Sequence, residues 1–169
     1  MTDKRSARGI HFGIIMIEVN ERIDVPATRE VVWSLLSDPR TVVECVDGAS
    51  LGEQHEDGTF DATMMVKFGP ARVTFRAKVG LELDPASMTG KVTARGKDNQ
   101  GGTRFRTTMS FGVTEQAEGQ GSAIPITAQV DISGKLASLV ETGARLVVKR
   151  MTVDFAERFA ARCSTANTA

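Results

Sequence analysis

The chain has 169 residues, of which 41% are hydrophobic, 21 are Lys or Arg and 21 are Asp or Glu. This length and hydrophobic content predict one domain with a substantial core, and the balanced charge excludes a globally basic nucleic-acid-binding protein. No stretch approaches the roughly 20 apolar residues that a membrane-spanning helix requires. The two cysteines, Cys45 and Cys163, match no metal or disulfide spacing, which is typical of an intracellular protein with ordinary thiols.

The N-terminal residues are basic and then apolar, a pattern that imitates a signal peptide. His11 and Gly13 interrupt the apolar run, and no small-residue cleavage site follows it. We therefore expect residues 1–15 to be a loose N-terminal extension. We expect residues 16–162 to form a single domain, followed by a short polar tail over residues 163–169.

The domain is expected to open with a strand and two short helices. Residues 16–25 alternate in polarity, and Pro26 ends the strand. Thr28 can cap a first helix, and Asp38 followed by Pro39 predicts the start of a second one, because these residues provide a capping side chain and a first-turn proline.

A run of antiparallel strands is predicted next, because apolar residues recur at every second position. The turn signals between these segments are short, so we expect a meander in which strands adjacent in sequence are paired. One face of the resulting sheet is apolar and needs a cover. The segments with the clearest alternation are residues 60–68, 73–81, 105–113 and 124–132.

One long amphipathic helix, over residues 136–161, can supply that cover. Its apolar residues fall at three- and four-residue steps along one stripe. The predicted fold class is therefore α+β, with a curved sheet that grips a C-terminal helix. Such an arrangement leaves room between sheet and helix, although any single Met or Phe of the stripe is more often plain core than a ligand contact.

The inward-facing residues are the candidate walls of a ligand cavity, for which a few hundred Å³ is the usual scale. Thr107 is the polar residue among them and can hydrogen-bond a ligand carbonyl, while a threonine satisfied within the sheet is the alternative. The candidate cavity residues are Phe60, Met64, Phe68, Phe75, Met88, Phe105, Thr107, Met109, Phe111, Leu139, Val140, Val147 and Met151.

The sequence offers little for catalysis or metal binding. His11 lies in the N-terminal extension, and His55 sits in a polar turn beside Glu56 and Asp57, where a solvated ring is expected. There is no tyrosine, and no cluster of His, Cys or carboxylates has the spacing of a metal site. We therefore expect no catalytic residue, no metal and no covalent cofactor.

Cations gather on the outward parity of three successive strands, so they share one convex face if the strands pair in order. Such a face can dock anionic lipid or an acidic partner, although strand surfaces are often rich in Lys and Arg for solubility alone. Nucleic acid is not an expected partner, because no exposed aromatic residues lie between these cations. The candidate docking residues are Arg72, Arg76, Lys78, Lys91, Arg95, Lys97, Arg104 and Arg106.

Five short motifs resemble, in their order and spacing, the CoxG branch of the START-like (SRPBCC) helix-grip superfamily, which is named for an accessory component of molybdenum-dependent carbon monoxide dehydrogenase. The resemblance covers residues 16 to about 161 and implies a seven-stranded antiparallel sheet wrapped around the C-terminal helix, with a cavity for an apolar ligand. The motifs are residues 25–27 (VPA), 31–39 (VVWSLLSDP), 45–48 (CVDG), 66–70 (VKFGP) and 131–137 (DISGKLA).

The resemblance also implies a function, namely a non-catalytic accessory protein of a molybdenum hydroxylase that binds a quinone or a similar lipid. The implied partners are an apolar small molecule and hydroxylase subunits, and the implied location is cytoplasmic with a peripheral contact at the inner membrane face. Many similar proteins carry a membrane-contacting tail, whereas only six residues follow Cys163 here, so we expect docking through the folded surface. A polyketide cyclase-like or hydrolase-like enzyme and an assembly factor with a filled core are the alternatives.

Overall fold

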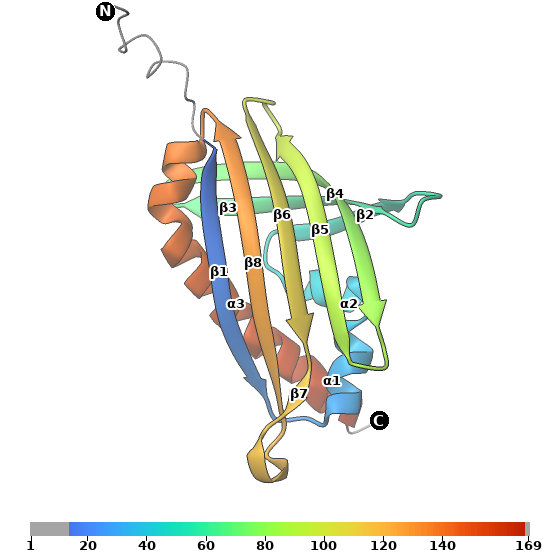
Figure 1. Cartoon of the computed structure of the whole chain (residues 1–169). Helices are drawn as coiled ribbons and strands as arrows, with labels where there is room; N and C mark the ends of the chain where they lie inside the picture. Colours follow the sequence, from blue (N-terminus) through green and yellow to red (C-terminus); the bar gives the residue numbers. More distant parts are fainter. Residues whose placement is uncertain (1–13, 168–169) are drawn as a thin grey trace, which may run out of the picture.

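The computed structural model describes residues 14–167 and shows one curved sheet with a long helix running along it (Figure 1). The α+β architecture is the one expected from the sequence. In chain order the elements are β1 (Ile15–Val25), α1 (Arg29–Leu36), α2 (Pro39–Glu44), β2 (Ala49–Gln54), β3 (Phe60–Phe68), β4 (Ala71–Asp84), β5 (Thr89–Asp98), β6 (Thr103–Gly112), β7 (Thr114–Glu115), a 3-10 turn η2 (Ala117–Gly119), β8 (Ser122–Gly134) and α3 (Ala137–Asn167).

The sheet is antiparallel and has the order β1-β8-β6-β5-β4-β3-β2, with the two-residue β7 pairing β8 beside this path. Seven strands form the main path, and β7 brings the total among the described residues to eight. The meander is confirmed from β2 to β6, but β1 pairs with β8 at the far edge rather than with β2. Helices α1 and α2 separate β1 from β2 and carry the chain across the end of the sheet.

Both short helices begin at the predicted caps. The backbone N–H of Val31 donates to Thr28 Oγ1 at 3.4 Å, and the N–H of Arg40 donates to Asp38 Oδ1 at 3.2 Å. Pro39 occupies the first turn of α2, where its missing N–H leaves no bond unmade. The local sequence therefore determines where both helices start.

The register divides the sheet into two faces. The alternate residues that point toward α3 form the inner face, and the residues of opposite parity form the outer face. The inner-face residues are mostly apolar, and they become buried where helices pack on them. The two ends of the inner face are closed in this way by two separate groups of residues.

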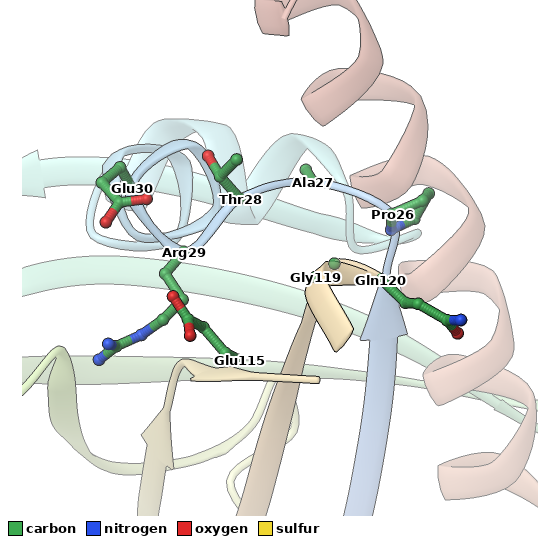
Figure 2. Close-up of a pocket in the computed structure, with 9 residues that line it drawn as sticks. Pro26, Ala27, Thr28, Arg29, Glu30, Glu115, Gly119 and Gln120 are labelled. Atoms are coloured by element: carbon green, nitrogen blue, oxygen red, sulfur yellow. The ribbon is translucent and has the colours of Figure 1, made fainter. Parts of the chain in front are cut away.

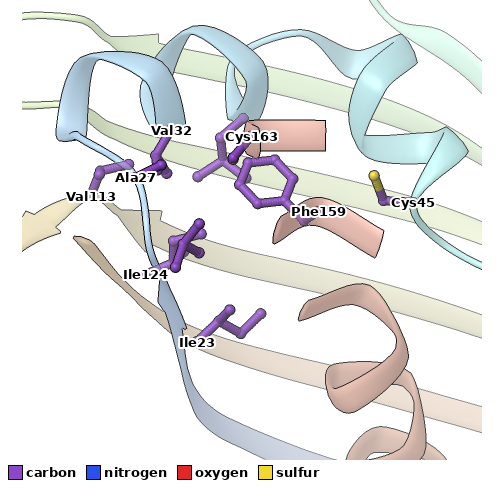
Figure 3. Close-up of a cluster of buried hydrophobic side chains, with 10 residues drawn as sticks. Ile23, Ala27, Val32, Cys45, Val113, Ile124, Phe159 and Cys163 are labelled. Carbon is purple, nitrogen blue, oxygen red and sulfur yellow. The ribbon is translucent and has the colours of Figure 1, made fainter. Parts of the chain in front are cut away.

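The first core cluster lies where α1 and the last turns of α3 meet the sheet, around the fully buried Phe159 (Figure 3). The second core cluster lies near the start of α3. The buried members of the first cluster are Ile23, Val25, Ala27, Val32, Leu36, Cys45, Val113, Ile124, Phe159 and Cys163. Those of the second are Phe68, Val73, Ile132, Ala137, Val140 and Val147.

Helix α3 runs past the boundary expected at residue 162. It continues to Asn167, and Cys163 is only 1% exposed. Phe155, Phe159 and Cys163 follow at four-residue steps, and the rings of Phe155 and Phe159 stack with centroids 5.3 Å apart. The prediction of a polar tail from residue 163 is therefore wrong, because the buried stripe of the helix extends to that residue.

Candidate ligand-binding face

Rows of side chains cross the middle of the inner face between the two core clusters. In one row, the register joins Phe60, Val79, Ala94, Thr107 and Val130 across five strands. A neighbouring row runs through Leu81, Val92, Met109 and Ala128. Apart from Thr107, these residues are apolar.

Much of this middle region remains partly open. Eight of its residues are half-buried, and neither core cluster includes them. Helix α3 packs mainly against β1 and β3 and less against β8, so it passes beside the central strands β4–β6 rather than filling the space above them. We call these eight residues the open inner face: Phe60, Met64, Val79, Leu81, Val92, Ala94, Thr107 and Met109.

The structure separates the thirteen candidate cavity residues into three groups. Four of them, Phe60, Met64, Thr107 and Met109, belong to the open inner face. The second core cluster buries Phe68, Val140 and Val147, and Phe75, Phe105, Leu139 and Met151 pack against it. Met88 and Phe111 pack against the first core cluster.

Met88 differs most from its expected position, because it does not lie on a strand. It occupies the turn between β4 and β5 with a φ of 53°, and its carbonyl accepts a hydrogen bond from Val113 N–H at 3.0 Å. Nearby, the rings of Trp33 and Phe111 lie 6.4 Å apart. The pattern of alternation does not extend through a turn, so parity could not place Met88.

The Thr107 hydroxyl has no hydrogen-bond partner among the residues that the structure describes, although the side chain is half-buried on the inner face. Its strand neighbours on either side are Ala94 and Val130, which offer no polar side chain. The alternative of a threonine satisfied within the sheet therefore does not hold for this side chain. A free hydroxyl in an apolar region is a ready hydrogen-bonding group for a bound molecule.

Two carboxylates also lie on the inner face, which the sequence reasoning overlooked. Asp98 is 5% exposed, and its Oδ1 accepts a 2.7 Å hydrogen bond from Thr103 N–H, so it fastens the β5–β6 turn. Glu21 is half-buried on β1 at the inner position opposite Ile126. Both residues share the parity of their apolar neighbours in the sequence, and that was the available signal.

Two hollows lie at the rim of the fold. One, of about 410 Å³, is bounded by the β1–α1 junction and the η2 loop, and the side chains of Arg29 and Glu115 point into the same region beneath α1 (Figure 2). The other, of about 700 Å³, lies over the ends of β4–β6 and includes Phe111. Neither hollow includes the four candidate residues of the open inner face, so an enclosed pocket there stays a prediction.

The family model for CoxG, a component of carbon monoxide dehydrogenase, matches residues 22–164 of this chain. The chain belongs to the CoxG family. The matched region begins within β1 and ends within α3, so it spans both core clusters and the open inner face. A search of the curated proteins found no match to this CoxG-family chain.

Solved structures establish a START-like helix-grip fold for this CoxG-family member. A protein from Geobacillus kaustophilus is 20% identical, with a TM-score of 0.76 over 89% of this chain and 97% of that one. The ZhuI aromatase/cyclase from Streptomyces sp. R1128 is 14% identical, with a TM-score of 0.58 over 89% and 94%. A START superfamily protein from Mycobacterium smegmatis is 15% identical, with a TM-score of 0.54 over 91% and 99%.

The titratable groups lie away from the open inner face of this CoxG-family chain. His55 Nε2 lies 2.7 Å from Asp61 Oδ1, so the ring is paired at the surface rather than simply solvated, and His11 falls outside the described residues. Burial raises the pKa of the Cys45 thiol, and it raises the pKa of the Cys163 thiol to about 11. Within residues 14–167, no three His, Cys, Asp or Glu side chains group as metal ligands.

All eight candidate docking cations lie on the outer face and are exposed. The Lys78 ammonium lies 3.6 Å from Asp57 Oδ2, an ion pair that the sequence did not suggest. Asp57 also accepts hydrogen bonds from Thr59, which hold its pKa at about 2. No helix in the described part of the chain has the length and hydropathy needed to cross a bilayer.

Proposed function

We propose that this CoxG-family chain holds an apolar ligand, a quinone or a similar lipid-like molecule, between its inner sheet face and α3 without transforming it. The observation that carries the proposal is the open inner face, whose apolar residues are half-buried where a solid core would bury them as fully as Ile124. Covering apolar surface contributes about 25 cal/mol per Å². A bound apolar molecule would complete the packing that the protein leaves unfinished.

Thr107 supports a ligand that carries a carbonyl group. Its unpartnered hydroxyl can donate one hydrogen bond from within an apolar row, and a quinone presents carbonyl oxygens on an apolar ring. A hydrogen bond of this kind contributes about 0.5–1.5 kcal/mol net, so it selects a ligand orientation more than it sets the affinity.

The proposed role is that of an accessory protein of a molybdenum hydroxylase. The CoxG family is named for a component of carbon monoxide dehydrogenase, and a quinone is a carrier that can pass electrons from such an enzyme to a membrane. Hydroxylase subunits are therefore the proposed protein partners. A peripheral contact at the cytoplasmic face of the membrane would give the ligand a route to and from the bilayer.

Titration with a short-chain ubiquinone tests ligand binding. Trp33, the only tryptophan, lies beside Phe111 at one end of the inner face, so its fluorescence should be quenched in a saturable way. Thr107→Val should weaken binding by about two- to tenfold through the lost hydrogen bond. Thr108→Val is the matched control, because Thr108 is the next residue and is exposed on the outer face.

Squalene, an isoprenoid hydrocarbon without a carbonyl, tests the role assigned to Thr107. Its affinity, measured by displacement of the quinone, should be the same for the wild type and Thr107→Val. The ligand-binding proposal fails if no quinone binds saturably. The carbonyl contact fails if Thr107→Val and Thr108→Val have equal affinities for the quinone.

A cyclase-like or hydrolase-like enzyme is the second candidate function, and Glu21 is the observation that favours it. A half-buried carboxylate on the inner face can act as a general base. By strand spacing, however, Glu21 and Thr107 lie roughly 15 Å apart, too far to act on one reacting centre. Glu21→Gln should leave quinone affinity within twofold, whereas a measured turnover that disappears in this variant would establish the enzyme.

A further inference from the structure

Six cations form a regular array on the outer face of β4, β5 and β6. Arg76, Lys97 and Arg104 lie side by side in one row, and Lys78, Arg95 and Arg106 form the adjacent row. Neighbouring strands are about 4.8 Å apart, and successive outward residues on one strand are about 6.8 Å apart. The six side chains, which we call the cationic array, therefore leave a backbone patch of roughly 10 by 7 Å.

Few acidic groups balance the cationic array. The row with Arg76 ends at Thr63 on β3 and Ser133 on β8, so it contains no carboxylate. In the other row, Lys78 pairs with Asp57, and Arg106 lies opposite Asp131. Within residues 14–167, the ion pairs leave the other five array cations without an acidic partner.

This arrangement lowers the stability of the sheet, because like charges placed directly opposite each other on paired strands repel. Solubility alone is served as well by cations and anions in alternation, which avoid that repulsion. An anionic partner would remove the repulsion by lying over the array. The cationic array therefore has the charge pattern of a binding surface.

The array also lacks side chains that could enter a bilayer. None of the large exposed apolar residues lies on β5 or β6 in the described part of the chain. The most exposed one, Leu146, is 76% exposed and lies on α3, on the other side of the sheet. Four of the six array cations are arginines, whose planar guanidinium groups match carboxylates in pairs of hydrogen bonds.

We propose that the cationic array is a docking surface for an acidic patch on a partner protein. Its cations are fixed by strand pairing, so they can meet carboxylates that are themselves fixed on a folded surface. A protein bound there contacts the outer face and leaves the inner face accessible. The proposal does not depend on what the inner face binds, so each can fail without the other.

Fluorescence anisotropy with labelled poly-L-glutamate of about 20 residues provides the test. The wild type should bind at low ionic strength and weaken toward physiological salt, where the screening length is about 8 Å. The triple variant Arg76→Gln, Arg95→Gln, Arg104→Gln should bind about tenfold more weakly, as expected for three exposed ion pairs. Arg106 is left unchanged because it lies opposite Asp131.

A second triple variant, Arg40→Gln, Arg145→Gln, Lys149→Gln, is the matched control. It removes the same charge from exposed positions away from the array, and its affinity should stay within twofold of the wild type. Circular dichroism should show both variants to be folded, because all six positions are exposed. Equal weakening in the two variants would overturn the proposal, since net charge rather than the array would then determine binding.

Vesicles of phosphatidylcholine with phosphatidylglycerol separate a protein partner from a membrane. If the array variant sediments with these vesicles as the wild type does but loses poly-L-glutamate, the proposal is supported. If it loses the vesicles and keeps poly-L-glutamate, the array is a membrane surface and the proposal is wrong. Loss of both also overturns the proposal, because the array would then be a general anion-binding surface.

Discussion

The first core cluster and the open inner face lie on the same side of the same strands, yet only the first is filled. Around Phe159 and Ile124, both 0% exposed, α1 and the end of α3 close on the sheet from two directions. In the middle, α3 passes beside the central strands, and residues such as Met109 stay half-buried. The alternation of a strand therefore fixes the side to which a residue points, whereas a second packing element decides whether that side is filled.

Phe159→Ala should show the largest effect of this contrast. Removing a fully buried ring leaves a cavity and costs about 3–5 kcal/mol of unfolding free energy, measured by urea denaturation. If the variant does not fold, Phe159→Leu provides a smaller cavity to measure. Phe155 is only half-buried, so Phe155→Ala should cost less than Phe159→Ala.

Met64→Ala and Met109→Ala should each cost only about 1 kcal/mol of unfolding free energy, because part of each side chain is already accessible. Their main effect should be on ligand preference, since methionine adapts its shape to irregular partners. Quinones with side chains of different length, titrated against each variant, measure this change. A loss of stability as large as that of Phe159→Ala would show that the middle of the face is packed.

The thiol of Cys163 should make stability depend on alkaline pH. Its folded pKa of about 11 lies above its ordinary value of 9.0, so the folded state favours the neutral thiol. The resulting stabilisation is complete below pH 9 and is lost as the pH rises toward 11. Urea denaturation across this range should show a shallower decline for Cys163→Ala, and parallel curves for the two proteins would contradict the assignment.

His55→Ala should have the smallest effect. The contact of His55 with Asp61 lies on the exposed outer side of the β2–β3 hairpin, where such pairs contribute about 0–1 kcal/mol. Quinone affinity should stay within twofold of the wild type. If the variant instead lost a measurable turnover while remaining folded, the active region would lie at this hairpin and the binding proposal would be wrong.

Local sequence signals predicted most of the fold correctly. The helix caps at Thr28 and Asp38 lie where the sequence places them, and the strand segments agree closely with β3, β4, β6 and β8. These features depend on neighbouring residues, so a single chain contains the necessary information. The pairing of β1 with β8 depends on residues far apart in sequence, and the meander rule predicted a different neighbour.

The candidate ligand-binding face was harder to predict, for a physical reason. Parity gave the same expectation for Phe68, which is buried, and for Met64, which lies in the open middle. The difference arises where α3 crosses the sheet, at Gly143, whose missing side chain leaves room for the Phe68 ring. A crossing point is set by the packing of distant elements, and no local pattern records it.

The pairing of β1 with β8 has a consequence for how the chain folds during synthesis. The two strands pair along 11 residues, yet roughly 100 residues separate them in sequence. At about 5–20 residues per second, the ribosome takes about 5–20 s to deliver β8 after β1 has emerged. During that interval the apolar residues of β1 have no final partner, so the nascent chain offers a target for chaperones, and this high contact order makes folding slow as well.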